Sequence, residues 1–221
     1  MYHTIFFDLD GTLTDSKEGI VNCLRRTLET MGRPVPEEAI LLKFVGPPLQ
    51  DSLRTYCGFT EEAQAQEATR IFRSYYTAQG QYENRAMPGM AELLSRLKAR
   101  GLTMAVASSK VEPMCRSICQ RFGFTPSLKA IVGSPPSDDS SKAAILREAM
   151  SRLGIAPQDA SRCLMVGDRK YDVAGARACG MDCLGVEFFG YADPGELREA
   201  GAVAVVDSLE GLEAFLVTNC Q

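Results

Sequence analysis

The sequence has little of what several classes of protein require. Its 221 residues include one histidine, His3, and no Asn-X-Ser/Thr glycosylation acceptor. No apolar run approaches the roughly 20 residues that a membrane span needs, and Asp8 and Asp10 interrupt the apolar start. We therefore expect neither a signal peptide nor a membrane association. His3 precedes the first apolar run, and we do not expect it to be catalytic.

An excess of charge of one sign is also lacking. The formal net charge is −4, with 45% hydrophobic and 24% charged residues, which is typical of a globular protein. Such a charge gives no broad attraction to a nucleic acid polymer or an anionic membrane, and we expect neither as a partner. The length suits one large domain or one domain with a smaller insertion.

Eight cysteines are spread thinly along the chain. Two pairs, Cys115/Cys119 and Cys179/Cys183, have four-residue spacing, which differs from the usual spacing of zinc ligands. We expect free thiols in a reducing compartment. The predicted location is cytoplasmic, and the predicted oligomeric state is a monomer or a weak dimer.

Six short apolar segments indicate buried β-strands, and amphipathic helical patterns separate most of them. The strand segments are residues 4–9, 102–108, 128–133, 163–168, 183–188 and 202–206. Strands that are apolar throughout and alternate with helices predict a parallel sheet covered on both faces. We therefore expect an α/β fold with a Rossmann-like parallel sheet.

The alternation of strands and helices fails once. Residues 16–85 contain only helical patterns, with loops at "GRPVPEE" and "VGPPLQ". We expect an inserted helical cap domain over 16–85 and a core domain formed by 1–15 and 86–221. The hinges are expected near residues 13–17 and 80–88.

Polar residues collect where the predicted strands end. Asp8 and Asp10 end the first strand, Ser108 the second, and Asp168 the fourth. In an open parallel sheet, ligands bind beyond the carboxyl ends of the strands. Two carboxylates about 4 Å apart repel by roughly 4 kcal/mol at an effective dielectric constant near 20. A cluster of three needs a cation, and oxygen ligands suit Mg²⁺.

Lys142 opens the helical pattern "KAAILREAM". A lysine at that position opposes the helix dipole, which favours anions by about 0.3–1 kcal/mol. The placement is reasonable if the lysine faces an anion. Carboxylates, a lysine, a hydroxyl and a divalent cation together indicate phosphoryl chemistry.

Four segments also resemble the motifs of the haloacid dehalogenase superfamily, in the same order. These are "DLDGTLTDS", "VASSK", Lys142 and "GDRKYD". The resemblance covers essentially the whole chain, and the helical block is similar to the cap of the phosphoglycolate phosphatase-like and 5′-nucleotidase-like branch.

The resemblance implies four catalytic residues. Asp8 would attack phosphorus and form an aspartyl-phosphate. Asp10 would give a proton to the leaving alkoxide and then take one from water. Ser108 would hydrogen-bond the phosphoryl oxygens, and Lys142 would neutralise them and orient Asp8.

The resemblance also implies a Mg²⁺ site. Asp8 and Asp168 would hold the ion together with the backbone carbonyl of Asp10. Asp172 would support it through water, and the alternative is that Asp172 only caps its own helix.

Substrate binding is assigned to residues of both predicted domains: Gly11, Thr12, Ser109, Gly46, Pro47, Pro48 and Arg54. Gly11 and Thr12 are expected to form a tight turn that brings backbone N–H groups to the phosphate. Residues 46–48 form either a substrate-facing loop or a plain connection between helices. Arg54 is either a cation for the substrate or part of a solvated helix face.

Several charged residues have competing interpretations. The family often has Lys-Pro where this chain has Lys142 followed by alanine, and Lys110 is a rival for the catalytic lysine. We expect Arg169 and Lys170 at the surface, and Asp138 and Asp139 in a solvated loop.

Asp10 distinguishes branches of the superfamily. Dehalogenase relatives lack this second aspartate, and phosphonate-cleaving relatives replace it with a small residue. We predict a Mg²⁺-dependent phosphomonoesterase that acts on a small phosphorylated metabolite such as phosphoglycolate or a nucleoside 5′-monophosphate. The alternatives are a sugar-phosphate mutase and a non-catalytic protein that binds a phosphorylated ligand.

Overall fold

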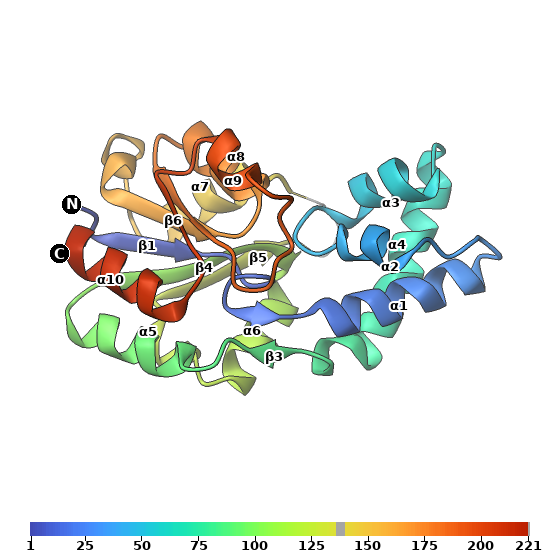
Figure 1. Ribbon diagram of the computed structural model, residues 1–221, viewed down its shortest axis with the longest axis horizontal. Helices are drawn as coiled ribbons and strands as arrows, with labels where there is room; N and C mark the ends of the chain where they lie inside the picture. The colour runs from blue at the N-terminus through green and yellow to red at the C-terminus, as the bar shows by residue number, and fades with distance from the viewer. Residues whose placement is uncertain (136–139, 221) are drawn as a thin grey trace.

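A computed structural model describes residues 1–135 and 140–220 (Figure 1). Its main sheet has six parallel strands in the order β5-β4-β1-β6-β7-β8. The strands are β1 Thr4–Phe7, β4 Thr103–Val111, β5 Ala130–Ser134, β6 Cys163–Gly167, β7 Asp182–Val186 and β8 Ala204–Val206. The predicted α/β fold with a parallel sheet is confirmed. Asp138 and Asp139 lie outside the described residues.

Helices cover both faces of this sheet because successive side chains of a strand point to opposite faces. Ile5 and Phe7 belong to one buried cluster, and Phe6 belongs to another. The first cluster includes α5 (Met90–Ala99), α6 (Glu112–Arg121) and α10 (Leu209–Asn219), and the second includes α7 (Lys142–Arg152), α8 (Lys170–Ala178) and α9 (Glu196–Ala200). Continuous apolar strands are therefore buried on both sides. Short 3₁₀ helices lie at Gly80–Tyr82, Thr125–Ser127 and Pro157–Arg162.

A helical block lies beside the carboxyl end of the sheet, at the end of the molecule opposite both termini (Figure 1). It consists of α1 Lys17–Thr30, α2 Glu38–Leu42, α3 Leu49–Cys57 and α4 Glu62–Ala78. The chain leaves and returns through the antiparallel pair β2 (Thr14–Asp15) and β3 (Arg85–Ala86). The block has its own buried cluster, which Tyr191 joins from the loop after β7. The division into cap and core domains at residues 15 and 85 stays a prediction.

The strand order places the site. The chain passes from β1 to β4 and β5 on one side and then returns to β6 on the other side of β1. The direction of winding thus reverses at β1, which is where open α/β sheets bind ligands. The carboxyl ends of β1, β4 and β6 meet at this point.

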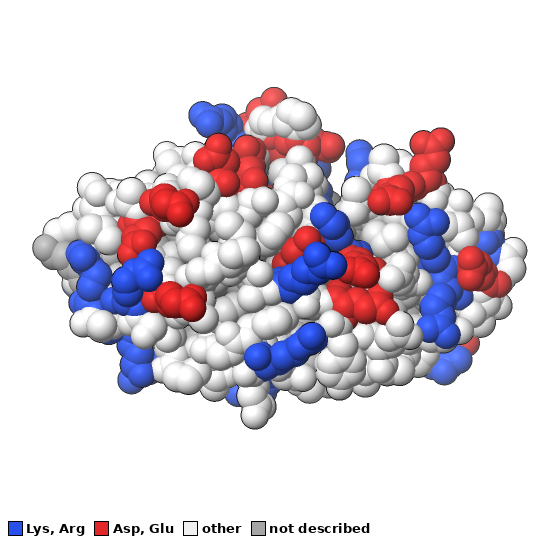
Figure 2. Space-filling model, turned by 60° about the horizontal axis from the view of Figure 1, so that its bottom comes forward, with Lys and Arg blue, Asp and Glu red and all other residues white. Residues whose placement is uncertain are grey.

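The surface carries charges of both signs. On the face in Figure 2, basic and acidic side chains are interspersed, and no field of one sign covers it. No helix in the described part of the chain is long and apolar enough to cross a membrane.

Candidate active site

Three buried carboxylates meet at the carboxyl edge of the sheet. Asp8 follows β1, Asp168 follows β6, and Asp172 lies in the first turn of α8. One carboxylate oxygen from each lies within 4.8 Å of the others. The side chains come from two strand ends and one helix, so the parallel sheet brings them together.

Two glycines make room for these carboxylates. Gly11 has φ +86°, and a Cβ on it would lie 2.1 Å from an oxygen of Asp168. A Cβ on Gly167 would lie 2.3 Å from the carboxyl carbon of Asp172. The Thr12 hydroxyl donates to the other Asp168 oxygen at 3.2 Å. The turn after β1 is thus shaped around Asp168.

The cluster is electrostatically unfavourable without a cation. Burial, followed by the charges of Asp172 and Asp8, holds the pKa of Asp168 well above its usual value. Burial also raises the pKa of Asp172. Asp168 Oδ2 is buried and has no hydrogen-bond partner among the described residues. A hard divalent cation fits this set, because it would satisfy that oxygen and offset the repulsion.

Lys142, the first residue of α7, supplies the positive charge of the cluster. Its Nζ lies 2.9 Å from Asp8 Oδ1 and 2.7 Å from Asp172 Oδ1, and it donates to the carbonyl of Ala107 at 3.1 Å. Burial alone would lower the pKa of a lysine, but the two carboxylates outweigh it and raise the pKa of Lys142. The side chain passes over Gly175, where a Cβ would meet Lys142 Cγ at 2.6 Å.

Asp10 has a different partner. Lys110 Nζ lies 2.9 Å from Asp10 Oδ2 and donates to the Tyr76 hydroxyl at 2.7 Å. The two lysines therefore do not compete for one position, since Lys142 pairs with Asp8 and Lys110 with Asp10. The Asp10 carboxylate lies outside the cluster of three acids, so a role for Asp10 at the metal through its backbone carbonyl stays a prediction.

A pocket opens between the sheet edge and the helical block. Residues from both sides line it, including Asp8, Asp10, Ser108, Ser109, Lys110, Phe44, Gly46, Pro47, Pro48, Leu49, Phe72, Tyr76 and Met114. The loop at 46–48 therefore faces the same space as Asp8, as the substrate-facing interpretation requires. Ser108 and Ser109 also lie here, within a strand that runs on to Val111 rather than ending at residue 108.

Two expectations about substrate binding concern the turn at Gly11 and Thr12 and the side chain of Arg54. The backbone N–H of Gly11 donates to Thr14 O at 2.7 Å, and that of Thr12 to Leu9 O at 3.4 Å, so both are used within the turn. Gly11 and Thr12 do form a tight turn, and the expectation that this turn brings backbone N–H groups to a phosphate stays a prediction. Arg54 pairs with Asp51 and Glu62 and is not among the residues that line the pocket.

The expectation that Arg169 lies at the surface is wrong, whereas Lys170 is exposed. Arg169 is 5% exposed, and its Nε lies 3.0 Å from Glu196 Oε1. Its Nη1 donates to the carbonyl of Val45 in the helical block at 2.8 Å. Gly46 packs on its side chain, where a Cβ would meet Arg169 Cγ at 2.9 Å. A buried arginine thus joins the segment after β6 to the loop before Pro47.

Asp172 caps its own helix and also contacts Lys142, whereas its support of a metal ion through water stays a prediction. Its carboxylate accepts the backbone N–H of Arg169 at 3.1 Å, which caps α8, and it pairs with Lys142. Tyr76 and Glu196 were not anticipated. Tyr76 looks like an ordinary apolar position of α4, and no sequence signal distinguishes it from a core residue. All eight cysteines are free, as expected.

Comparisons with known proteins agree with this geometry. The family model of haloacid dehalogenase-like hydrolases matches residues 5–186. The chain is 42% identical to a 5′-nucleotidase of Pseudomonas aeruginosa over 89% of this chain and 87% of that protein. It is 30% identical to a phosphoglycolate phosphatase of Cupriavidus necator over 96% and 92% of the two chains.

Two further similarities concern a kinase and a solved structure. The chain is 41% identical to the tyrosine-protein kinase PtkA of Mycobacterium tuberculosis over 86% of this chain, and it spans 64% of the length of that protein. The crystal structure of a predicted phosphatase from Clostridium acetobutylicum superimposes with a TM-score of 0.92 at 37% identity, covering 99% of each chain. The fold, the motifs at the strand ends and these similarities together show that the chain belongs to the haloacid dehalogenase-like hydrolases.

Proposed function

We propose that the protein is a Mg²⁺-dependent phosphomonoesterase that acts through an aspartyl-phosphate on Asp8. The observation that carries the proposal is the position of Lys142, whose amine contacts both Asp8 and Asp172 beside the unpaired oxygen of Asp168. One fixed cation and three carboxylates form a place where a phosphoryl group and a divalent ion can bind together. Relatives named 5′-nucleotidase and phosphoglycolate phosphatase support the phosphatase class.

The reaction has two displacements at phosphorus. In the first, a carboxylate oxygen of Asp8 forms a bond to phosphorus while the bond to the ester oxygen breaks, and Asp10 gives that oxygen a proton. In the second, Asp10 takes a proton from water as the water oxygen attacks phosphorus. Inorganic phosphate leaves, and the Asp8 carboxylate is restored.

The surrounding residues stabilise the charge on the phosphoryl oxygens. Lys142 is buried and oriented by two carboxylates, so it is preorganised for this task. Ser108, 2% exposed at the pocket, offers a hydroxyl to the same oxygens. Asp8, Asp168 and Asp172 would hold Mg²⁺, which supplies further neutralisation of negative charge when bound.

The substrate that we propose is a small phosphorylated metabolite, with nucleoside 5′-monophosphates and phosphoglycolate as the first compounds to test. The loop at 46–48 lines the same pocket as Asp8 and would contact the part of the substrate beyond the phosphate. We further propose a cytoplasmic protein that is a monomer or a weak dimer, which fractionation and light scattering after size exclusion would test.

The direct experiment measures release of inorganic phosphate from p-nitrophenyl phosphate and from the metabolite panel, with Mg²⁺ and with EDTA. We expect turnover only with Mg²⁺ and loss of nearly all of it in Asp8→Asn. The matched control is Asp159→Asn, an exposed acid distant in the fold from this site. Binding of a phosphorylated ligand without turnover would favour the non-catalytic alternative.

Two other outcomes would also contradict the proposal. Transfer of the phosphoryl group from a phosphorylated sugar to another hydroxyl of that sugar, rather than to water, would indicate a mutase. The name of the kinase relative calls for incubation with ATP and a tyrosine-containing peptide. Phosphorylation of that peptide, in the absence of phosphatase turnover, would replace the proposed reaction class.

A further inference from the structure

A chain of three buried side chains joins the helical block to Asp10. Tyr76 of α4 is 2% exposed, and its hydroxyl accepts from Lys110 Nζ at 2.7 Å. The same Nζ lies 2.9 Å from Asp10 Oδ2 and 4.1 Å from the centre of the Tyr76 ring. All three residues line the pocket. A residue of the block thus reaches the proposed proton-transfer group through one lysine.

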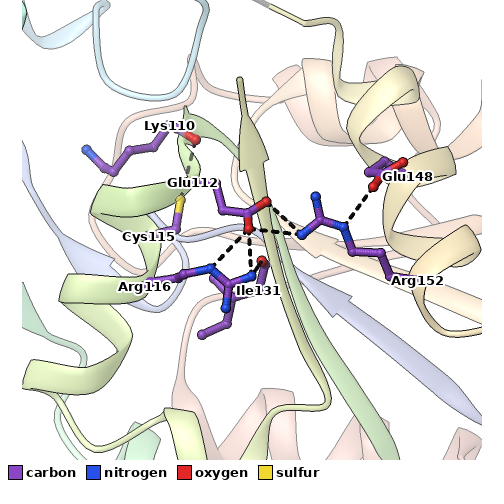
Figure 3. Close-up of polar contacts among 7 residues, drawn as sticks. All are labelled: Lys110, Glu112, Cys115, Arg116, Ile131, Glu148 and Arg152. Carbon is purple, nitrogen blue, oxygen red and sulfur yellow. Dashed lines mark hydrogen bonds and ion pairs between the residues drawn. The ribbon is translucent and has the colours of Figure 1, made fainter. Parts of the chain in front are cut away.

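Two contacts of its carbonyl oxygen fix the backbone of Lys110. Its carbonyl accepts the Cys115 thiol at 3.4 Å, and it faces Gly133 of β5 so closely that a Cβ there would lie 2.3 Å from the carbonyl oxygen. Figure 3 shows the Lys110 side chain pointing away from Glu112, which follows two residues later.

Glu112, the first residue of α6, anchors the junction between β4 and α6 (Figure 3). Its carboxylate forms ion pairs with Arg116 at 2.6 Å and with Arg152 of α7 at 2.8 Å. Arg116 also donates to the carbonyl of Ile131 in β5 at 3.2 Å. The junction between β4 and α6 is therefore held by contacts with β5 and α7, and these contacts fix the backbone that carries Lys110.

Asp10 is held on one side only. Its Oδ2 pairs with Lys110, whereas its Oδ1 is buried without a hydrogen-bond partner among the described residues. An unpaired carboxylate oxygen in a pocket is costly unless a ligand group meets it. In the proposed reaction, the ester oxygen of a substrate bound at Asp8 would be the missing partner of Asp10 Oδ1.

Tyr76 is in turn fixed within the helical block. Its ring stacks on that of Phe72, one turn earlier in α4, with centroids 5.6 Å apart and planes at 14°. The hydroxyl can reach Lys110 only where α4 lies against the end of β4. The hydrogen bond between Tyr76 and Lys110 therefore forms only when the helical block packs against the end of the sheet.

We propose that Lys110 and Tyr76 are positioning residues for Asp10, and that proton transfer to the leaving group depends on the seating of α4 against the sheet. The inference rests on the proposed phosphatase function. Lys110 holds one oxygen of Asp10 so that the other meets the leaving oxygen, and Tyr76 fixes Lys110. Neither residue forms or breaks a bond.

The test compares a substrate that needs an acid with one that does not. An alkyl phosphate leaves as a strongly basic alkoxide, whereas p-nitrophenyl phosphate leaves as a stabilised phenolate. A positioned acid contributes about 10²–10⁴-fold. In Lys110→Met we expect kcat on the alkyl phosphate to fall about 10²-fold, at least ~10-fold more than on p-nitrophenyl phosphate, with KM within about threefold.

Two further variants sharpen the test. Tyr76→Phe removes one oxygen and keeps the ring, and we expect the same pattern with a smaller loss of about 3- to 10-fold, since one hydrogen bond is worth about 1 kcal/mol. In the Asp10→Asn background, Lys110→Met should cause no additional loss on the alkyl phosphate, because residues that act through one group are not additive. The control is Tyr75→Phe, whose hydroxyl contacts Thr30 at 2.9 Å away from the pocket; its kinetics should match those of the wild type.

Specific results would overturn the inference. Equal losses on both substrates, a change confined to KM, or a further loss when Lys110→Met is added to Asp10→Asn would each contradict it. If Lys110→Met does not fold, Tyr76→Phe carries the test, and an unchanged ratio of the two kcat values in that variant contradicts the inference. A wild-type protein that is active on both substrates while the variants lack the pattern refutes only this inference. A wild-type protein inactive on both refutes the proposed function as well.

Discussion

A Cβ atom on Gly11 would lie 2.1 Å from a carboxylate oxygen of Asp168, so the turn after β1 and the acid after β6 fit together only because residue 11 has no side chain. Gly11 also has φ +86°, a conformation that L side chains rarely adopt. The relationship explains why a glycine follows the two aspartates of the first motif. It also gives a prediction.

Gly11→Ala should remove activity almost completely and lower the free energy of unfolding by more than the roughly 1 kcal/mol expected from backbone conformation alone. The matched control is Gly32→Ala, since Gly32 has φ +62° but nothing within 4 Å of its Cβ position. Urea unfolding and phosphate release would measure both effects. Equal destabilisation by the two substitutions would mean that the turn can relax away from Asp168.

Asp168 should link stability to pH and to Mg²⁺. Its pKa is raised in the folded protein by burial and then by Asp172 and Asp8. The folded state therefore keeps a proton on Asp168 that the unfolded chain has released, and the contribution of Asp168 to metal-free stability should fall as pH rises above about 4, the ordinary carboxyl range.

Asp168→Asn removes this loss of stability. Without metal, we expect its Tm to exceed that of the wild type by an increasing margin as pH rises from about 4. Mg²⁺ should raise the Tm of the wild type and not that of the variant. A metal-free variant that is less stable than the wild type at every pH would contradict the raised pKa of Asp168. A variant that keeps the full Mg²⁺ shift in Tm would contradict the placement of the ion.

Lys142→Met should be both inactive and unstable. It leaves the buried carboxylates of Asp8 and Asp172 without their cation, and breaking a buried pair typically costs about 3–5 kcal/mol. The control is Lys129→Met at an exposed position. Chemical denaturation without Mg²⁺ measures the loss, and a variant as stable as the control would show that the cluster does not need this charge.

Arg169→Met should destabilise the protein by about 3–5 kcal/mol, because it leaves the buried carboxylate of Glu196 without its guanidinium partner and the carbonyl of Val45 without its donor. Lys170→Met is the control, since Lys170 is the next residue in the sequence and is exposed. Unfolding free energies of the two variants should differ by most of that amount. Equal values would mean that the link between the segment after β6 and the helical block is not maintained in solution.

Arg54→Gln should leave kcat/KM within about twofold of the wild type on every substrate tested, as expected of a surface change worth at most about 0.5 kcal/mol. Arg54 is engaged by Asp51 and Glu62 outside the pocket. A selective loss on an anionic substrate would restore the interpretation of Arg54 as a substrate cation.

Much of the fold follows from local patterns. Apolar strands that alternate with amphipathic helices require a parallel sheet buried on both faces, and such a sheet brings its carboxyl ends to one edge. The meeting of Asp8, Asp168 and Lys142 could therefore be predicted from their places at the ends of β1 and β6 and at the start of α7. The interruption over residues 16–85 likewise predicted the helical block.

Only the tertiary structure decided the partners of the remaining polar groups. Lys110 and Lys142 look alike in the sequence, and their pairing with Asp10 and Asp8 depends on where β4 and α7 pass the end of β1. Arg169 reads as a surface residue because its partners, Val45 and Glu196, lie far away along the chain. The periodicity of a strand or helix predicts which face a residue occupies. The partners of a buried ion pair depend on which side chains lie close together in the folded chain, and no local pattern predicts them.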